Sequence, residues 1–263
     1  MNLKLEGKKA FISGSTQGIG FAIAQHLLAE NAEVITNGRN REKTKLAVQK
    51  LLTEFPNAKI SGFAADFGKK EEVEELVQKL NDIDILINNV GIFELKNFED
   101  LDDEDWYKFF EINVMSSIRL SKKLLPSMLT KKTGRIIFIS SESGSNIPGN
   151  MIHYGMTKAA MSAISNGLSK LTKGTEVTLN TILGGPTYSD GVAATIEQIA
   201  AMQNLEVEQM KSLIVQQTNP DSLLQRFINP SEIASLAVYL SSPLSIATNG
   251  ASLRADGGVL KTI

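Results

Sequence analysis

Short apolar segments alternate with longer segments of helical periodicity along almost the whole chain. The apolar segments have the length and continuity of strands buried on both faces, at residues 10–12, 33–36, 59–64, 83–87, 135–139, 177–182 and 251–254. Between them, helical patterns occupy residues 21–31, 42–55, 70–80, 103–129 (one long helix or a broken pair), 153–172 and 231–240. This alternation predicts an α/β fold, a doubly wound parallel sheet with helices on both faces.

The 263 residues contain no linker, low-complexity tract or internal repeat, so we expect a single domain over residues 1–263. One segment, residues 188–225, interrupts the alternation after the sixth expected strand. It would lie at the carboxyl end of the sheet, where open α/β sheets bind ligands. We interpret it as a lid over the substrate; the alternative is a helical insertion without substrate contact.

Composition excludes several classes of chemistry. The chain has no cysteine, which rules out disulfides, thiolate catalysis and cysteine-bound metal. Its two histidines, His26 and His153, are far apart in sequence, so no metal site is expected. The net charge of −2 does not indicate nucleic-acid binding, and no apolar run is long enough for a secretion signal or a membrane span. We therefore expect a soluble, cytoplasmic protein.

Three glycines separate the first expected strand from the helix after it: Gly14, Gly18 and Gly20, in the sequence Ser-Gly-Ser-Thr-Gln-Gly-Ile-Gly. Glycine allows a tight turn that brings backbone N–H groups close to a pyrophosphate, and a helix N-terminus favours that negative charge. Such a turn can be purely structural. Its place between a strand and a helix favours dinucleotide binding.

The end of the second expected strand indicates which dinucleotide is bound. An acidic residue about 20 residues after the turn would bind the ribose 2′-hydroxyl of NAD, but residues 36–40 read Thr-Asn-Gly-Arg-Asn. Gly38 leaves space, and Arg39 can pair with a 2′-phosphate. We expect NADP(H) in preference to NAD(H). NAD(H) stays an alternative, because Arg39 can equally be an ordinary solvated arginine.

Two further segments follow expected strands. Asp66 could accept a hydrogen bond from the adenine amino group, or it could cap the helix that starts near Lys69. Asn88-Asn89-Val90-Gly91 ends the fourth strand. Gly91 permits close approach to the cofactor, and the asparagine side chains can bridge neighbouring strands.

Tyr154 and Lys158 lie four residues apart at the start of an expected helix, so both side chains can face one pocket. A nearby positive charge would lower the pKa of the Tyr154 phenol and make it a general acid/base near neutral pH. Ser141, at the end of the fifth strand, could polarise a substrate carbonyl. Asn113 is unusual within an apolar helix. It could open the helix and hold a water beside Lys158, or be a buried amide satisfied by the backbone.

Together these motifs resemble the short-chain dehydrogenase/reductase family, in its single-domain branch, from Lys8 to Gly258. The resemblance implies a Rossmann-type fold and an enzyme that moves a hydride between a nicotinamide and a CH–OH or carbonyl group. It implies a catalytic set of Asn113, Ser141, Tyr154 and Lys158. It implies that the cofactor is bound by Gly14, Ser15, Gln17, Gly18, Ile19, Gly20, Arg39, Asn40, Asp66, Phe67, Asn89, Val90, Gly91, Tyr154, Lys158, Gly185 and Thr187.

The chain departs from the usual pattern of this family at four places. Ser13 stands where threonine is usual, Val90 where alanine is usual, and Gly184-Gly185 where Pro-Gly is usual. The family's NADP-preferring members often carry a second basic residue near the position of Gln17, and it is missing here. Its absence weakens the expected NADP preference without reversing it.

The resemblance also implies a mechanism. In reduction, Tyr154 gives its proton to the substrate oxygen while Ser141 hydrogen-bonds the same oxygen. Lys158 anchors the nicotinamide ribose and lowers the Tyr154 pKa, and Asn113 positions water. The expected partners are a small carbonyl or alcohol substrate and further copies of the chain, in a homotetramer or homodimer.

Two other classes of function are alternatives. A redox-sensing NADP-binding protein without turnover usually lacks the tyrosine or the lysine, and both are present here. An epimerase or dehydratase usually has an added carboxyl-terminal substrate domain, for which 263 residues leave little room. The substrate itself is not indicated. Lys211 is the single basic residue within 188–217, so a strongly anionic substrate lacks obvious partners there.

Overall fold

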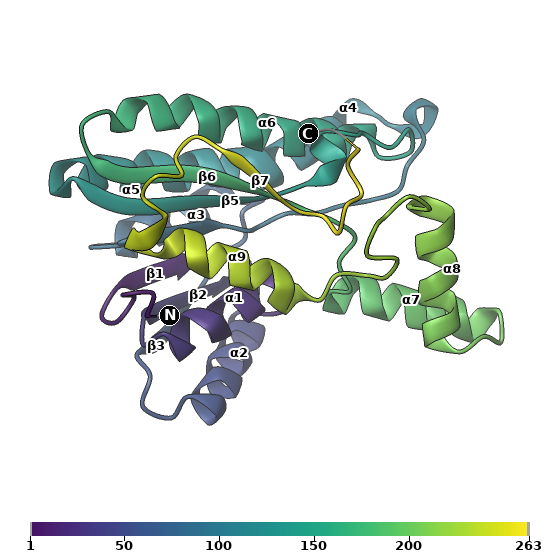
Figure 1. The fold of residues 1–263 in the computed structure, drawn as a ribbon, viewed down its shortest axis with the longest axis horizontal. Helices are drawn as coiled ribbons and strands as arrows, with labels where there is room; N and C mark the ends of the chain where they lie inside the picture. The colour runs from purple at the N-terminus through teal and green to yellow at the C-terminus, as the bar shows by residue number, and fades with distance from the viewer. Residues whose placement is uncertain (1, 262–263) are drawn as a thin grey trace.

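Within residues 2–261, which the computed structural model describes, the strands form one parallel sheet (Figure 1). The strands are β1 (Lys9–Ile12), β2 (Glu33–Gly38), β3 (Ile60–Ala64), β4 (Ile85–Asn88), β5 (Thr133–Ser141), β6 (Glu176–Gly184) and β7 (Ser252–Ala255). Their order is β3-β2-β1-β4-β5-β6-β7, so β1 pairs with both β2 and β4. The chain winds outward from this centre in both directions, which confirms the predicted doubly wound α/β fold.

Helices connect the strands and cover the sheet. They are α1 (Gly18–Ala29), α2 (Arg41–Glu54), α3 (Lys70–Lys79), α4 (Asp103–Phe109), α5 (Ser116–Lys131), α6 (Ile152–Ser169), α7 (Asp190–Met202), α8 (Val207–Thr218) and α9 (Pro230–Ser241). In the described part of the chain, no helix combines the length and the apolar character needed to cross a membrane.

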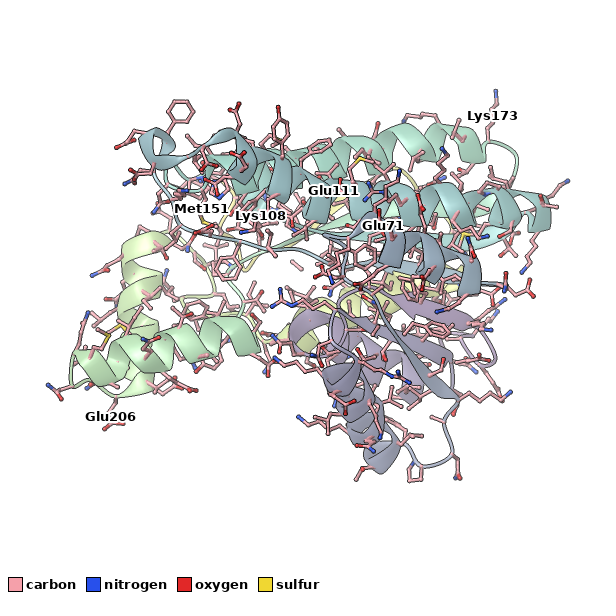
Figure 2. All side chains as sticks on the ribbon, turned by 180° about the vertical axis from the view of Figure 1, so that it is seen from behind. Glu71, Lys108, Glu111, Met151, Lys173 and Glu206 are labelled. Atoms are coloured by element: carbon pink, nitrogen blue, oxygen red, sulfur yellow. The ribbon has the colours of Figure 1, made fainter. Side chains whose placement is uncertain are left out.

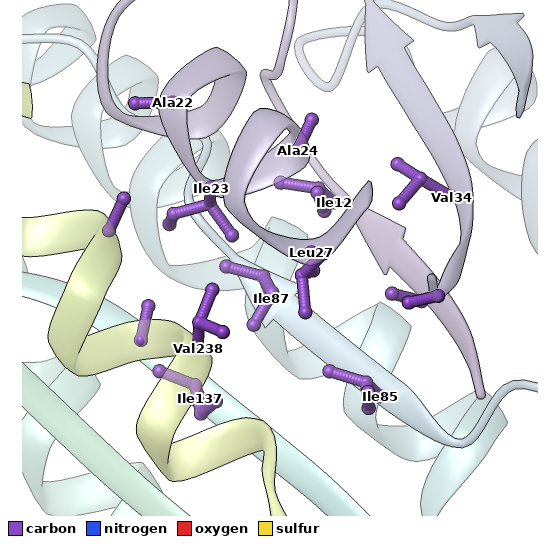
Figure 3. Close-up of a cluster of buried hydrophobic side chains, with 14 of the residues drawn as sticks. Ile12, Ala22, Ile23, Ala24, Leu27, Val34, Ile85, Ile87, Ile137 and Val238 are labelled. Atoms are coloured by element: carbon purple, nitrogen blue, oxygen red, sulfur yellow. The ribbon is translucent and has the colours of Figure 1, made fainter. Parts of the chain in front are cut away.

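Side chains that alternate along the strands build a separate core on each face of the sheet. Ala10 and Ile12 of β1 belong to one core, and Phe11 between them belongs to the other. The first core lies under α1, α2 and α9, and Figure 3 shows Leu27 of α1 and Val238 of α9 over the strands. The second core lies under α3, α5 and α6. Both cores hold the strands in place beneath the loops at their carboxyl ends.

The element types predicted from the sequence are confirmed, while several boundaries are wrong. β5 and β6 extend to Ser141 and Gly184, because the two strands remain paired to these residues. The first helix begins at Gly18, three residues before the predicted start. The predicted helix over 103–129 is a helical path in three parts, in which a π-helical segment, Phe110–Met115, joins α4 to α5. α9 is capped by Asn229, so the helix starts at Pro230.

The segment predicted to be a lid forms two helices, α7 and α8, that stand beside the sheet (Figure 1). They share a small core built on Ile196, Ala200 and Met210. Figure 2 shows Glu206, between the two helices, at the far corner of this pair, whereas Met151, at the start of α6, lies on the side that faces the pair. This position is compatible with a lid, and the covering of a substrate stays a prediction.

Candidate functional site

The glycine turn between β1 and α1 is fastened to the neighbouring strands on both sides. Gly14 and Gly18 have positive φ angles of 63° and 61°, a conformation that favours glycine. The Gly14 N–H donates to Asn37 Oδ1 at 3.1 Å, and Asn89 Nδ2 donates to Gly14 O at 2.8 Å. The N–H of Ser15 donates to Asn37 O at 2.7 Å, and Ser15 is completely buried. The N–H groups of Gly14 and Ser15 are therefore used inside the turn.

The first turn of α1 presents N–H groups that have no acceptor within the helix. The N–H of Gly18 donates to Asp190 Oδ2 at 2.6 Å. The N–H groups of Ile19 and Gly20 find no acceptor among residues 2–261. Gln17, the N-cap residue, makes no side-chain hydrogen bond to this turn. The turn can thus bind an anion through Ile19 and Gly20.

Asp190 contacts the glycine turn, and the sequence did not predict this contact. It belongs to the first turn of α7 and lies 172 positions after Gly18. Its neighbour Ser189 also lies near the turn, since a Cβ on Gly18 would be 3.4 Å from Ser189 Cβ. No local motif marks such a contact, because only the tertiary fold brings α7 to the glycine turn.

The end of β2 lies against the same turn. Gly38 does not leave open space, because a Cβ there would collide with Thr16 Cγ2. Arg39 is exposed and forms no ion pair within residues 2–261. Asn40 is the N-cap of α2, where its Oδ1 accepts from the Lys43 N–H at 3.0 Å. Arg39 is therefore the residue of this segment that is available to a phosphate.

The segment after β3 corrects one of the two predicted roles of Asp66. The N-cap of α3 is Lys69, so Asp66 does not cap that helix. Asp66 Oδ1 accepts from the Gly68 N–H at 2.9 Å, and its own N–H donates to Glu72 Oε2 at 2.9 Å. Phe67 is buried in the second core, which leaves its backbone for any contact with a ligand. An adenine contact stays a prediction for both residues.

Tyr154 and Lys158 are brought together in the first turns of α6. Lys158 Nζ lies 5.6 Å from the centroid of the Tyr154 ring and donates to Ile139 O at 3.0 Å. Lys158 is buried, while Tyr154 remains partly exposed. The Tyr154 ring meets Phe93 edge-on, with centroids 6.5 Å apart. The Tyr154 ring is therefore held by its surroundings, and the residue as a whole is still partly exposed.

The predicted lowering of the Tyr154 pKa is wrong for the protein chain alone. Burial raises the pKa of the phenol; the Ser141 hydroxyl opposes this rise, and the negative charge of Glu142 adds to it. Burial also lowers the pKa of Lys158 to about 8, against the attraction of Glu142. Tyr154 is consequently protonated at neutral pH, the state in which it can donate a proton.

Ser141 lies at the end of β5, beside Gly184 at the end of β6. Its Oγ accepts from the Ser143 N–H at 3.1 Å and is hydrogen-bonded to Glu142 Oε2 at 2.5 Å. Burial raises the pKa of the Glu142 carboxyl, and its hydrogen bonds with the two serines oppose that rise. Glu142 was not predicted as a site residue, although its position next to Ser141 was an available signal.

Asn113 is completely buried in the π-helical segment between α4 and α5. Its Oδ1 accepts from the Ile92 N–H at 2.8 Å, and its Nδ2 donates to Ile92 O and to Thr157 Oγ1, both at 3.0 Å. The predicted opening of the helix is observed as the π-helical segment. The amide is hydrogen-bonded mainly to backbone, which was the alternative role predicted for it. Asn113 thereby links the loop after β4 to α6.

The loop after β4 packs closely against both the glycine turn and Lys158 of α6. A Cβ on Gly91 would lie 3.3 Å from Lys158 Nζ, so this glycine allows the ammonium to approach the backbone. Val90 Cγ2 would lie 3.0 Å from a Cβ on Gly14. The larger side chain at Val90 therefore fits because the glycine turn has no side chain opposite it.

The loop after β6 is held against the carboxyl-terminal segment. A Cβ on Gly185 would lie 2.6 Å from Asp256 O, which explains why the chain needs glycine there. Thr187 Oγ1 donates to Gly185 O at 2.8 Å, and Thr187 also bridges to Ile228. This loop leads directly into α7.

Comparison with known proteins shows that both the sequence and the fold recur. The family model described as short chain dehydrogenase matches residues 8–200. The chain belongs to the short-chain dehydrogenase family. It is 43% identical over 263 residues to the uncharacterized oxidoreductase YvaG of Bacillus subtilis, covering 100% of both chains. It is 31% identical to a D-beta-hydroxybutyrate dehydrogenase of Cupriavidus necator, covering 97% of this chain and 98% of that protein.

Solved structures agree with this placement. The L-sorbose reductase of Gluconobacter frateurii, crystallised with NADPH and L-sorbose, matches with a TM-score of 0.93 and 27% identity over 100% of both chains. This short-chain dehydrogenase is thus an oxidoreductase with the expected Rossmann-type sheet. Within residues 2–261, no group of three His, Asp or Glu side chains is arranged to hold a metal ion.

Apart from Gly185 and Thr187, which lie in the loop after β6, the predicted site residues of this short-chain dehydrogenase fall into two groups. The glycine turn, Asn89, Asn113, Ser141 and the Tyr154–Lys158 pair are connected by the contacts above, at the carboxyl ends of β1, β4 and β5. Arg39, Asn40, Asp66 and Phe67 follow β2 and β3, on the other side of the glycine turn. Such a division suits an elongated ligand that crosses the turn.

His153, next to Tyr154, has a consequence for stability. It is completely buried against Phe109, at a ring-centroid distance of 4.2 Å, and neither ring nitrogen has a hydrogen-bond partner within residues 2–261. Burial lowers the pKa of His153, so folding favours the neutral ring. The unfolded chain takes up this proton near pH 6.5, and stability should therefore fall as the pH drops below about 6.5.

We expect His153→Phe to reduce this loss, which can be measured as the difference in Tm between pH 7.5 and pH 5. The matched control is His26→Gln, since His26 is less buried and is hydrogen-bonded to Ser231. This variant should keep the wild-type decrease in Tm. An equal decrease in His153→Phe would show that other groups cause the acid sensitivity.

Proposed function

We propose that this short-chain dehydrogenase interconverts a carbonyl compound and the corresponding alcohol with NADP(H), using Tyr154 as general acid/base. The observation that carries the proposal is the position of the Tyr154 phenol. The Tyr154 side chain is partly exposed, and the centroid of its ring lies 5.6 Å from Lys158 Nζ. The same edge of the sheet carries the glycine turn, so a nucleotide on the turn can reach the phenol.

The residues present fit a dinucleotide. Ile19 and Gly20 offer N–H groups to a pyrophosphate, and Gly91 has no side chain to keep a ring away from Lys158. Arg39 is exposed at the end of β2, without a carboxylate beside it that would select a free 2′-hydroxyl. The L-sorbose reductase with a TM-score of 0.93 was crystallised with NADPH, which supports the same choice here.

When bound, the reduced nicotinamide supplies a hydride to the substrate carbonyl carbon. Tyr154 then donates its proton to the developing alkoxide, and the raised pKa keeps that proton in place at neutral pH. Ser141 hydrogen-bonds the same oxygen and stabilises its charge. Lys158, positively charged below about pH 8, can hold a ribose hydroxyl beside Tyr154. Asn113 fixes α6 to the loop after β4 and so holds this geometry.

The test is consumption of NADPH with a panel of hydroxyketones, simple ketones, aldehydes and 3-oxoacyl thioesters, followed by the reverse assay with the product alcohol and NADP⁺. Turnover of one class identifies the substrate group. Tight NADPH binding with no turnover across the panel would favour the alternative of a redox-sensing protein.

Arg39→Ala is expected to raise the Kd for NADPH about 10- to 100-fold, because a charge-assisted hydrogen bond contributes about 1.5–3 kcal/mol. The Kd for NADH should change less than about threefold, since NADH has no 2′-phosphate. Arg41→Ala is the matched control, because Arg41 is an exposed arginine two positions away. Equal losses for both cofactors would show that Arg39 does not read the 2′-phosphate.

Two further properties stay part of the proposal. The α7–α8 pair closes over the substrate, and the base of α7 already touches the glycine turn through Asp190. The chain assembles as a homotetramer or homodimer, which light scattering on the purified protein will test.

A further inference from the structure

The carboxyl group of Glu142 lies beside the reacting end of the proposed site. Glu142 follows β5 directly and begins a short 3₁₀ turn, Glu142–Gly144. One carboxyl oxygen is hydrogen-bonded to Ser141 Oγ at 2.5 Å, and the other accepts from Ser143 Oγ at 3.1 Å. Glu142 is therefore fixed against the serine that is proposed to hold the substrate oxygen.

Ser141 has a single hydroxyl hydrogen, so the charge of Glu142 decides whether that hydrogen can be donated to a substrate oxygen. A serine hydroxyl has one hydrogen to donate and two lone pairs to accept with. One lone pair is already used by the Ser143 N–H, at 3.1 Å. If Glu142 is ionised, the single hydroxyl hydrogen goes to the carboxylate, and none is left for a substrate oxygen. If Glu142 is protonated, it donates to the second lone pair, and the Ser141 hydrogen is free.

The ionisable groups around Glu142 come from α6. Tyr154 and Lys158 both interact electrostatically with the Glu142 carboxylate. His153, on the same helix, is packed against Phe109 instead. β6, which also packs against this turn, ends in Thr-Ile-Leu-Gly and brings no ionisable group at that end. Tyr154 and Lys158 are thus the two ionisable groups that interact electrostatically with the Glu142 carboxyl.

We propose that Glu142 is a positioning residue whose protonated carboxyl turns the Ser141 hydroxyl towards the substrate oxygen. The proposal rests on the proposed carbonyl reduction. Burial, which raises the pKa of this carboxyl, extends the range of pH over which the active arrangement persists. When Glu142 loses its proton, the hydroxyl turns back to the carboxylate, and the transition state loses one hydrogen bond.

The expected signature is a decrease in the rate of reduction as pH rises through the pKa of Glu142. The rate should level off about 10²- to 10³-fold lower, the usual effect of losing one donor to a developing oxyanion. Glu142→Gln should remove this decrease, because its amide N–H₂ donates to Ser141 Oγ at every pH. Above the wild-type transition, the variant should therefore be faster than the wild type.

A second variant moves the transition without removing it. Ser143→Ala deletes the hydrogen bond from Ser143 Oγ, which lowers the pKa of Glu142 in the wild type. The transition should consequently shift to higher pH. Single-turnover hydride transfer with NADPH, measured from pH 5 to 9, provides the profiles for all three proteins.

An infrared titration gives a readout that does not depend on activity. The C=O band of protonated Glu142, identified by its absence in Glu142→Gln, should persist above the ordinary glutamate range. An unchanged transition in Glu142→Gln, an unmoved or lower transition in Ser143→Ala, or loss of the band near pH 4.3 would overturn the proposal. If no carbonyl is reduced by the wild type, the proposed function fails, while the infrared result still decides the state of Glu142.

Discussion

Tyr154→Phe is expected to lower the rate of carbonyl reduction by about 10²- to 10⁴-fold, the usual contribution of a positioned general acid. The variant loses the phenolic proton and keeps the ring, including its edge contact with Phe93. Lys158 retains its hydrogen bond to Ile139 O, so the site should keep its shape. The Kd for NADPH and the Tm should therefore stay near the wild-type values. Stopped-flow hydride transfer and fluorescence titration measure the two effects separately.

The matched control is Tyr107→Phe, because Tyr107 lies on α4 and is 73% exposed. This variant removes the same hydroxyl group outside the site and should retain full activity. The assignment of Tyr154 fails if Tyr154→Phe turns over at the wild-type rate.

The raised pKa of Tyr154 also affects the reverse reaction, oxidation of the alcohol. Oxidation of the alcohol needs the deprotonated phenol, so its rate should increase with pH, since the pKa of Tyr154 is raised.

Gly20→Ala is expected to disrupt the glycine turn and weaken NADPH binding at least about tenfold. A Cβ at this position would lie 2.5 Å from both Asn89 Nδ2 and Gly14 O. One of these atoms is backbone and the other braces the turn, so neither can move without changing it. Overpacking of this kind costs about 1–3 kcal/mol, equivalent to a decrease of roughly 2–6 °C in Tm for a chain of this size.

Gly167→Ala provides the comparison, since Gly167 is also a helical glycine and a Cβ there meets nothing within 4 Å. Alanine should stabilise α6 by up to about 1 kcal/mol and leave NADPH binding unchanged. Calorimetry and cofactor titration of the two variants separate the effect of lost flexibility from that of the clash. Wild-type NADPH affinity in Gly20→Ala would contradict the role given to this turn.

The fold follows from regular sequence patterns with few exceptions. Apolar runs marked the inner strands because both faces of the sheet are buried there, as Ala10 and Phe11 show by entering opposite cores. The edge strands β3 and β7 are partly exposed instead. Strand ends were less well predicted. β6 continues to Gly184 because β5 pairs with it along its length, and this partner is remote in sequence.

The candidate site likewise contains residues that were recognisable in the sequence and residues that only the structure revealed. The spacing of Tyr154 and Lys158 is a local helical property, and the glycine turn lies between a strand and a helix, so both were recognisable in the sequence. Glu142 and Asp190 were missed. The contact between Asp190 and Gly18 joins residues 172 positions apart, and no local pattern encodes it.

The sequence by itself determined the order of strands and helices, the glycine turn and the residue types of the proposed catalytic set, because each depends on neighbours within a few positions. Only the tertiary structure decided the direction of the Tyr154 pKa. The sequence indicated a nearby positive charge and hence a lower value, whereas burial and Glu142 raise it. The charge state of a buried group depends on everything that packs around it, and that environment is assembled from β5, α6 and the loops between distant elements.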